Sequence, residues 1–263
     1  MISNDDGVNK KYTGSSHVTI DEFRSGNVPD VNGFRIYVDE ISTNFCPYID
    51  PSQSRGATTY TLVRSDTTSA EEAEELVFGC AYALCELLRF KRAALQTEHQ
   101  TTLLCENIIF EFPYLDDTLG KELLAWPHFV LKCRYTQLGI LFGKFWIGAK
   151  EAAKDGRELP SPPCHFISIR DNVMTRDPRF FDEAKWLLPA LESSCDNGQE
   201  VWADIIGSQR ADSAVRDFCA EHSRLNYARV NASLVDSSFY SQAKRLAANE
   251  LNANKSTTAT RGD

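Results

Sequence analysis

The chain has 263 residues, of which 42% are hydrophobic, and this composition excludes a largely disordered protein because it supplies a sizeable buried core. Its formal net charge of −9 argues against binding to nucleic acid or to an anionic membrane, because both need a basic face. The polar, acidic first residues and the lack of any run of about 20 apolar residues predict a cytoplasmic protein without a membrane partner.

The first half of the chain alternates between strand and helix patterns. Residues 1–16 are polar and predict a disordered arm, whereas the β-branched and aromatic segment 58–63 is typical of a strand. Ser69 and Glu72 form a capping box, in which each side chain satisfies a free amide at a helix start. Apolar residues at helical spacing extend this amphipathic helix over 70–92.

Further strands and one interrupted helix follow in the middle of the chain. The pattern predicts strands at 103–112, 138–146 and 165–170. A helix is expected within 117–134, and Pro127 should break or kink it, because proline lacks the amide hydrogen that an inner helical turn needs. In the last strand, alternation divides the side chains between two faces, with His165, Ile167 and Ile169 on one and Phe166, Ser168 and Arg170 on the other.

The C-terminal third has the pattern of helices. Asp177 and Pro178 are typical of a helix start, because aspartate caps free amides and proline fits the first turn. This helix is expected to run to Pro189. Further helices are expected in three segments, namely 198–206, 209–227 and 236–251.

Together these elements predict an α+β fold. Its central sheet should be mostly antiparallel or mixed, contain about four or more strands and be packed by helices, with a helical C-terminal third. We expect a single domain over 17–251. Its core would span 45–190, its helical extension 198–251, and a disordered tail would follow over 252–263.

No standard catalytic or nucleotide-binding motif is present. The chain lacks Gly-x-x-x-x-Gly-Lys-Ser/Thr, Gly-x-Gly-x-x-Gly, Gly-x-Ser-x-Gly and His-Glu-x-x-His. Its eight cysteines also lack Cys-x-x-Cys and zinc-finger spacing, so most are expected to be free, buried thiols. Candidate chemistry is therefore confined to short segments.

Four side chains in these segments could bind a ligand or a metal. Cys46, fixed by the following proline, could bind a metal or heme iron as a thiolate, or lie buried at a turn. His165 follows a proline-rich stretch and could be a metal ligand, or a hydrogen-bonded residue of the core or sheet edge. Arg170 could bind the carboxylate of a ligand, or an internal Asp or Glu. His128 could face a pocket or pack in the core.

The same segments resemble a bacterial family known only as a domain of unknown function. That family carries an early Cys-Pro-aromatic, a glycine-spaced strand, and a Ser-Pro-x-Pro stretch that leads into Ile-Arg, then Val and Asp. The matching stretches here are Cys46-Pro47-Tyr48, 139–146 and 161–170, the last followed by Val173, Asp177 and Phe180-Phe181, within a similarity over about 45–190. Trp146 departs from the family, which tends to have histidine there. Such proteins occur among small-molecule biosynthesis enzymes.

The size and layout of the chain are also similar to those of heme proteins that hydroxylate nitrogen on amino acids, notably arginine. This similarity implies a heme-dependent oxygenase of natural-product biosynthesis, with iron held by His165, Cys46 or His128. Arg170 would then bind the carboxylate of the substrate. Aromatic side chains would line a dry pocket that shields the oxidant, namely Phe142, Trp146 and Phe166.

The alternative is a cofactor-free accessory or ligand-binding protein. It would hold a small carboxylate-bearing molecule in the same cavity, or a partner protein on its C-terminal helices. Trp146 in place of the family's histidine favours this alternative, as does the absence of any catalytic spacing. The oligomeric state stays open, with a homodimer as one candidate.

Overall fold

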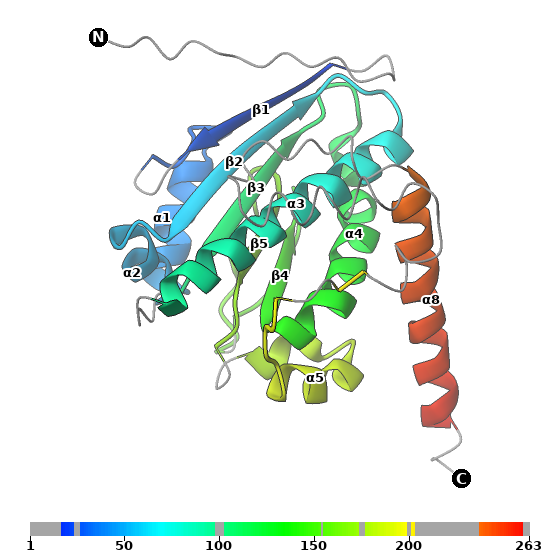
Figure 1. The fold of residues 1–263 in the computed structure, drawn as a ribbon. Helices are drawn as coiled ribbons and strands as arrows, with labels where there is room; N and C mark the ends of the chain where they lie inside the picture. The colour runs from blue at the N-terminus through cyan, green and yellow to red at the C-terminus, as the bar shows by residue number, and fades with distance from the viewer. Residues whose placement is uncertain are drawn as a thin grey trace.

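A computed structural model describes most of the chain. The described residues run from 17 to 259, apart from 24–26, 98–102, 154, 174–176, 199–200 and 203–236. In this part a five-stranded mixed sheet lies between helices on both of its faces (Figure 1). The predicted α+β class and mixed sheet are therefore confirmed.

The strands of the sheet follow the order β1-β2-β3-β5-β4. Strands β2 and β3 are parallel, and every other neighbouring pair is antiparallel. The bounds of the five strands are Val18–Phe23 for β1, Thr58–Ser65 for β2, Cys105–Glu111 for β3, Ile140–Phe145 for β4 and His165–Asp171 for β5. Strands β2 to β5 lie close to the predicted segments, whereas β1 was not predicted.

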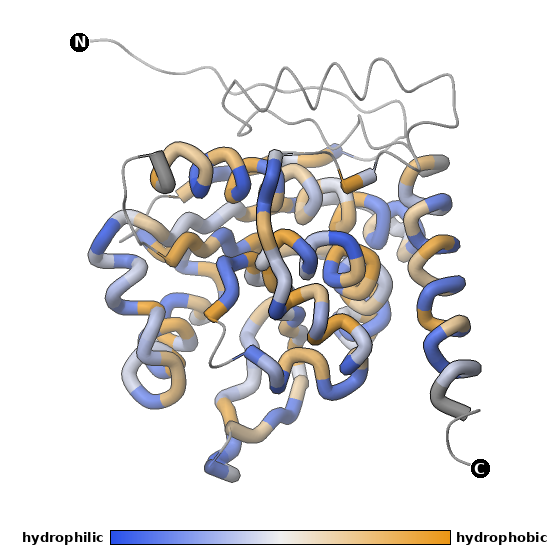
Figure 2. The backbone as a smooth tube through the Cα atoms, turned by 60° about the horizontal axis from the view of Figure 1, so that its bottom comes forward, coloured by the Kyte–Doolittle hydropathy of each residue, from blue (hydrophilic) through white to orange (hydrophobic). Residues whose placement is uncertain are grey.

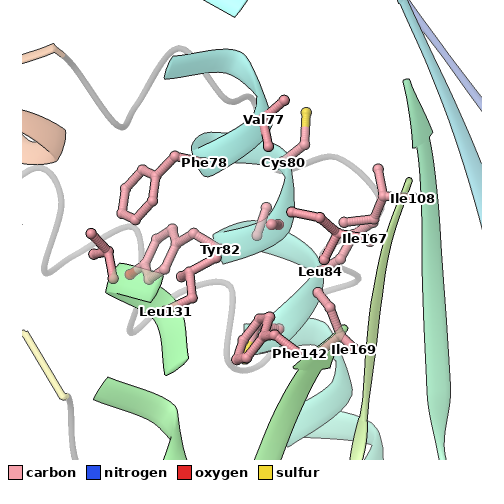
Figure 3. Close-up of a cluster of buried hydrophobic side chains, with 14 of the residues drawn as sticks. Val77, Phe78, Cys80, Tyr82, Leu84, Ile108, Leu131, Phe142, Ile167 and Ile169 are labelled. Atoms are coloured by element: carbon pink, nitrogen blue, oxygen red, sulfur yellow. The ribbon is translucent and has the colours of Figure 1, made fainter. Parts of the chain in front are cut away.

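Two long helices, α3 (Ala70–Thr97) and α4 (Gly120–Tyr135), cover the first face of the sheet. One half of the predicted capping box forms, since the Ser69 hydroxyl accepts the Glu72 backbone N–H at 3.3 Å. In the other half Thr67 intervenes: its hydroxyl oxygen accepts the Ser69 backbone N–H at 3.1 Å and donates to the Glu72 carboxylate at 2.6 Å. Figure 3 shows the sheet residues Ile108, Ile167 and Ile169 on one side of α3, and Phe78 and Tyr82 with Leu131 of α4 on the other. This double-sided packing explains why α3 carries buried apolar residues on more than one side.

The second face of the sheet has two separate covers. Helices α1 (Phe34–Asn44) and α2 (Ile49–Ser54) pack over β2, β3 and the start of β5. At the other edge, Leu141 of β4 packs against three short turns of helix. These are η3 (Asp177–Phe181), η4 (Lys185–Leu187) and α5 (Leu188–Glu192). The continuous helix expected from Asp177 to Pro189 is thus interrupted.

The last helix, α8 (Ser237–Ala259), lies along α3 and α4 (Figure 1). Tyr240 and Lys244 both donate hydrogen bonds to Glu74 of α3, each at 2.6 Å. Hydrophobic and hydrophilic turns alternate along α8 in Figure 2, as expected for a helix with one buried face. The expected tail over 252–263 is corrected here, because the helix continues to Ala259.

Several other expectations have a definite outcome. Pro127 lies inside α4 and does not end it, since the helix runs unbroken to Tyr135. The expected arm at 1–16 and the helix at 209–227 lie outside the described residues, and so does most of 198–206. No helix of the described residues has both the length and the apolar character needed to cross a membrane.

Candidate functional site

A cavity of about 550 Å³ lies at the end of the sheet where strands β2 and β3 finish and β5 begins. Because β2 and β3 are parallel, their carboxyl ends lie together at this end of the sheet. Ligands of sheets with parallel strands are commonly bound outside these carboxyl ends. The cavity wall includes Asp66 after β2, Glu111 at the end of β3, and Cys164 and His165 at the start of β5.

His165 is a buried residue of the cavity wall whose two ring nitrogens both face protein atoms. The backbone N–H of Ile147 donates to Nδ1 at 3.3 Å. The other nitrogen, Nε2, lies 3.6 Å from a carboxylate oxygen of Asp117. Burial lowers the pKa of His165 and outweighs the opposing effect of Asp117. The ring is therefore neutral near pH 7, and because Nδ1 accepts a hydrogen bond, its proton lies on Nε2.

Gly120, the first residue of α4, makes this position of His165 sterically possible. A Cβ built on Gly120 would lie 2.2 Å from Cε1 of His165, closer than real contacts allow. The short helix η1 (Asp117–Leu119) leads directly into α4, so the same turn carries both Asp117 and Gly120. Glycine spacing in the sequence did not single out Gly120, because its only special property is this contact with a distant strand.

The ionisable side chains of the cavity are mainly acidic. Asp66, Glu111 and Asp117 are the carboxylates of the wall, and Arg64 is its guanidinium. Arg64 binds Glu111 at 2.5 Å and also Asp21 of β1 at 2.8 Å. The side chain of Asp117 is 70% exposed. Three carboxylates and one guanidinium line the wall, so its acidic groups outnumber its strongly basic ones.

Sequence reasoning missed this acidic set. The signal that could have found it is position, since Asp66 follows the first predicted strand and Glu111 ends the second. A second signal is Asn32, which lines the cavity with a φ of 47°. It is the one non-glycine residue with positive φ among the described residues. Asparagine tolerates this left-handed conformation better than most residues, and such positions are often functional.

The aromatic residues expected to share a pocket lie on opposite faces of the sheet. Phe142 is buried in the core beneath α3 and α4, and Trp146 packs against the same cluster. Phe166 faces α1 and stacks on Phe145 with ring centroids 4.3 Å apart. The common dry pocket expected from the sequence is therefore not formed, because neighbouring residues of a strand alternate between faces.

Arg170 has the internal partner that the sequence left open. Its guanidinium binds both carboxylate oxygens of Asp177, at 2.6 and 3.1 Å. Asp177 is itself buried and also accepts the backbone N–H of Val173. The face of the guanidinium lies 5.0 Å from the ring centroid of Phe180. A ligand carboxylate at Arg170 would have to displace a fork-shaped ion pair, which favours the internal partner of the two alternatives that the sequence left open.

His128 and Cys46 do not line the cavity. Nε2 of His128 lies 2.7 Å from the carbonyl oxygen of Phe142, to which the neutral ring donates. Burial lowers its pKa to about 3, and the charges of Lys132 and Lys144 add to this effect. Cys46 lies just after α1 and donates its backbone N–H to Ile41 at 2.8 Å. Within the described residues, no group of three or more His, Cys, Asp or Glu side chains is arranged to hold a metal ion.

No family model, curated protein or solved structure matches this chain. The resemblance to the uncharacterised bacterial family therefore stays a prediction. Of the residues singled out from the sequence, His165 is the one that lines the cavity. A function is best inferred from His165 and the acidic groups around it.

Proposed function

We propose that this chain is a cofactor-free binding protein for a small polar molecule, which it holds in the cavity at the carboxyl ends of β2 and β3. The observation that carries the proposal is the cavity itself. Its volume of about 550 Å³ lies within the range of roughly 300–1,000 Å³ that is usual for small-molecule sites. Convergent polar groups from separate elements line it beside the apolar wall of Phe110 and Phe112.

The state of His165 supports binding rather than proton transfer. A general base needs a nitrogen that faces the substrate and a pKa near the working pH. Here Nδ1 accepts the Ile147 amide and Nε2 faces Asp117. The ring is also packed against Gly120, which prevents it from turning. His165 therefore acts as a fixed part of the cavity wall.

A ligand screen by thermal unfolding tests this proposal. The purified chain would be mixed with amino acids, amines, dicarboxylates and inorganic phosphate. A ligand present at 100 times its dissociation constant stabilises the folded state by about 2.7 kcal/mol, which gives a clear shift in melting temperature. Thr19→Trp, which places a large ring in the cavity wall, should abolish the shift. Ser241→Trp on the exposed face of α8 is the matched control and should leave it unchanged. If no compound shifts the parent chain, or if Thr19→Trp keeps the shift, the proposal fails.

A heme-dependent oxygenase that acts on an amino acid such as arginine is the second candidate. The observation that favours it is that His165, one of the three expected iron ligands, lines the cavity. Histidine is a common axial ligand of heme, and bound heme would supply oxygen activation. His165 would hold the iron through Nε2 and would have to exchange its contact with Asp117 for this bond.

The ultraviolet–visible spectrum of the protein from heme-replete cells tests the second candidate. Bound heme gives an intense band near about 400 nm, and His165→Ala should remove it. Cys46→Ala and His128→Gln are the comparison variants, since neither residue lines the cavity. A featureless spectrum after reconstitution with heme would exclude the oxygenase and leave the binding protein.

A further inference from the structure

We infer that the molecule bound in this cavity carries an amine or guanidinium group, and that Asp117 is the carboxylate that binds it. The inference rests on the proposed function, because it names the class of ligand for the same cavity. It departs from the carboxylate-bearing ligand expected from the sequence. Four features of the cavity wall support it: the pairing of Arg64, the charge on Asp117, the capped helix start and the exposed ring of Tyr114.

Arg64 is already neutralised by two carboxylates. It is the one Lys or Arg among the described residues that line the cavity. Its Nε donates to Glu111 at 2.5 Å and its NH1 donates to Asp21 at 2.8 Å. A ligand carboxylate would have to break one of these bonds before it could bind. The cavity therefore presents no uncompensated cation to an anionic ligand within the described residues.

Asp117, in contrast, faces a neutral partner. Its ion-pair partner is His165, whose Nε2 lies 3.6 Å away, beyond the usual length of a hydrogen bond. His165 is neutral near pH 7 because burial lowers its pKa, so it does not cancel the charge. Asp66, a second carboxylate of the cavity wall, accepts the backbone N–H of His17, which is an uncharged donor. A cationic ligand would thus meet two carboxylates that have no Lys or Arg partner within the part of the chain that the structure describes.

The helix start at the cavity does not favour an anion. Free amides at a helix start attract phosphate and carboxylate groups. Here the side chain of Asp116 accepts the backbone N–H of Thr118 at 2.8 Å, and Asp117 occupies the first turn of η1. Carboxylates of the chain already complement the positive end of this helix, and an anionic ligand would be repelled by them.

Tyr114 supplies an exposed aromatic ring to the same cavity wall as Asp117. It is 67% exposed, although most tyrosine rings in the described residues are buried or partly buried. Both residues line the cavity and lie in the same connection between β3 and α4. The face of an exposed ring attracts a cation, and guanidinium also stacks on it. A cavity wall with both an aromatic ring and a carboxylate is therefore suited to an amine or guanidinium group rather than to an anion.

Calorimetric titration of the full chain tests the inference. The probes are agmatine, L-arginine and putrescine as cations, and succinate and inorganic phosphate as anions, all at one ionic strength. We expect the cations to bind and the anions not to bind. Agmatine should bind as well as arginine, because it keeps the guanidinium and lacks the carboxylate. Asp117→Asn keeps the shape of the side chain and removes its charge, and should weaken cation binding about tenfold, which corresponds to about 1.4 kcal/mol.

Three further variants make the result specific. Tyr114→Leu removes the ring and should weaken cation binding several-fold. Asp182→Asn, on the exposed turn after η3, is the matched control and should leave binding unchanged. Equal cation binding in the parent chain and in Asp117→Asn would overturn the inference. So would binding of succinate or phosphate that is lost in Arg64→Met, although the cavity would then still be a binding site. A failure of all probes together with the thermal screen would instead contradict the proposed function.

Discussion

The position of the His165 ring in the cavity wall depends on glycine at position 120. The two residues lie on different elements, and the imidazole occupies the space that any side chain on Gly120 would need. The same ring accepts the Ile147 amide and faces Asp117. A change at Gly120 is therefore expected to act on the cavity through His165.

Gly120→Ala is predicted to destabilise the protein by about 1–3 kcal/mol, because the added methyl group forces the imidazole out of its place. The direction of the change in stability tests this steric explanation, because replacing glycine by alanine inside a helix normally stabilises the helix by up to about 1 kcal/mol. Urea denaturation would measure the change. In a double-mutant cycle, His165→Ala should remove most of the cost of Gly120→Ala. Additive effects of the two substitutions would contradict the steric explanation.

At the scale of elements, a buried group of charges joins α3 to the far end of the sheet. Arg89 binds Glu86 of the same helix at 3.0 Å and Asp196, after α5, at 2.9 Å. Arg92 binds Asp171 of β5 at 3.1 Å and also contacts Asp196. Burial acts to raise the pKa of Asp196. Hydrogen bonds from Arg89 and from the Gly198 amide outweigh this effect and lower the pKa to about 2. This group holds the segment after α5 against the first helical layer.

Asp196→Ala is predicted to destabilise the protein by roughly 3–5 kcal/mol, because it leaves two largely buried guanidinium groups without a shared partner. Asp155→Ala is the matched control, since Asp155 forms an exposed ion pair with Arg157. Chemical denaturation of both variants should show a large shift for the first and no measurable shift for the second. Equal effects would mean that the buried group does not contribute more than a surface pair.

At the scale of the whole molecule, two histidines that are neutral in the folded protein, the buried His165 and the partly buried His128, connect stability to pH. Burial lowers the pKa of His128 to about 3 and also lowers that of His165. In the unfolded chain both would titrate near their ordinary value of about 6.5. Between the folded and unfolded values the unfolded chain binds more protons, so stability is complete above about pH 6.5 and falls as the pH decreases.

His128 alone is predicted to cost about 3 kcal/mol of stability at pH 4 relative to pH 7, from the difference between its folded and unfolded pKa values. Denaturation curves between pH 4 and 7 would measure this loss. His128→Gln keeps a donor for the Phe142 carbonyl but cannot take up a proton, so the loss should become smaller by that amount. A parent profile that His128→Gln leaves unchanged would contradict a neutral His128 in the folded protein.

The agreement between sequence and structure depends on how local the signal is. The capping box at Ser69 and the helical spacing after it predicted the start of α3, because a helix is stabilised by contacts three and four residues apart. The alternation in β5 correctly divided Ile167 from Phe166. Strand β1 was missed because it is an exposed edge strand with a weak pattern, and the turns after Asp177 follow the packing of Leu141 rather than their own spacing.

By itself the sequence determined the fold class, most strands and helices of the sheet core, and His165 as a residue worth testing. The tertiary structure decided which side chains meet. It paired Arg64 with Glu111 and His165 with Asp117, and it turned Phe142 away from Phe166. The physical reason is the sequence separation of the contacts, because periodicity depends on residues that are close together along the chain. A cavity between the ends of β2, β3 and β5 depends instead on strand order and register, which are set by contacts between residues far apart in sequence.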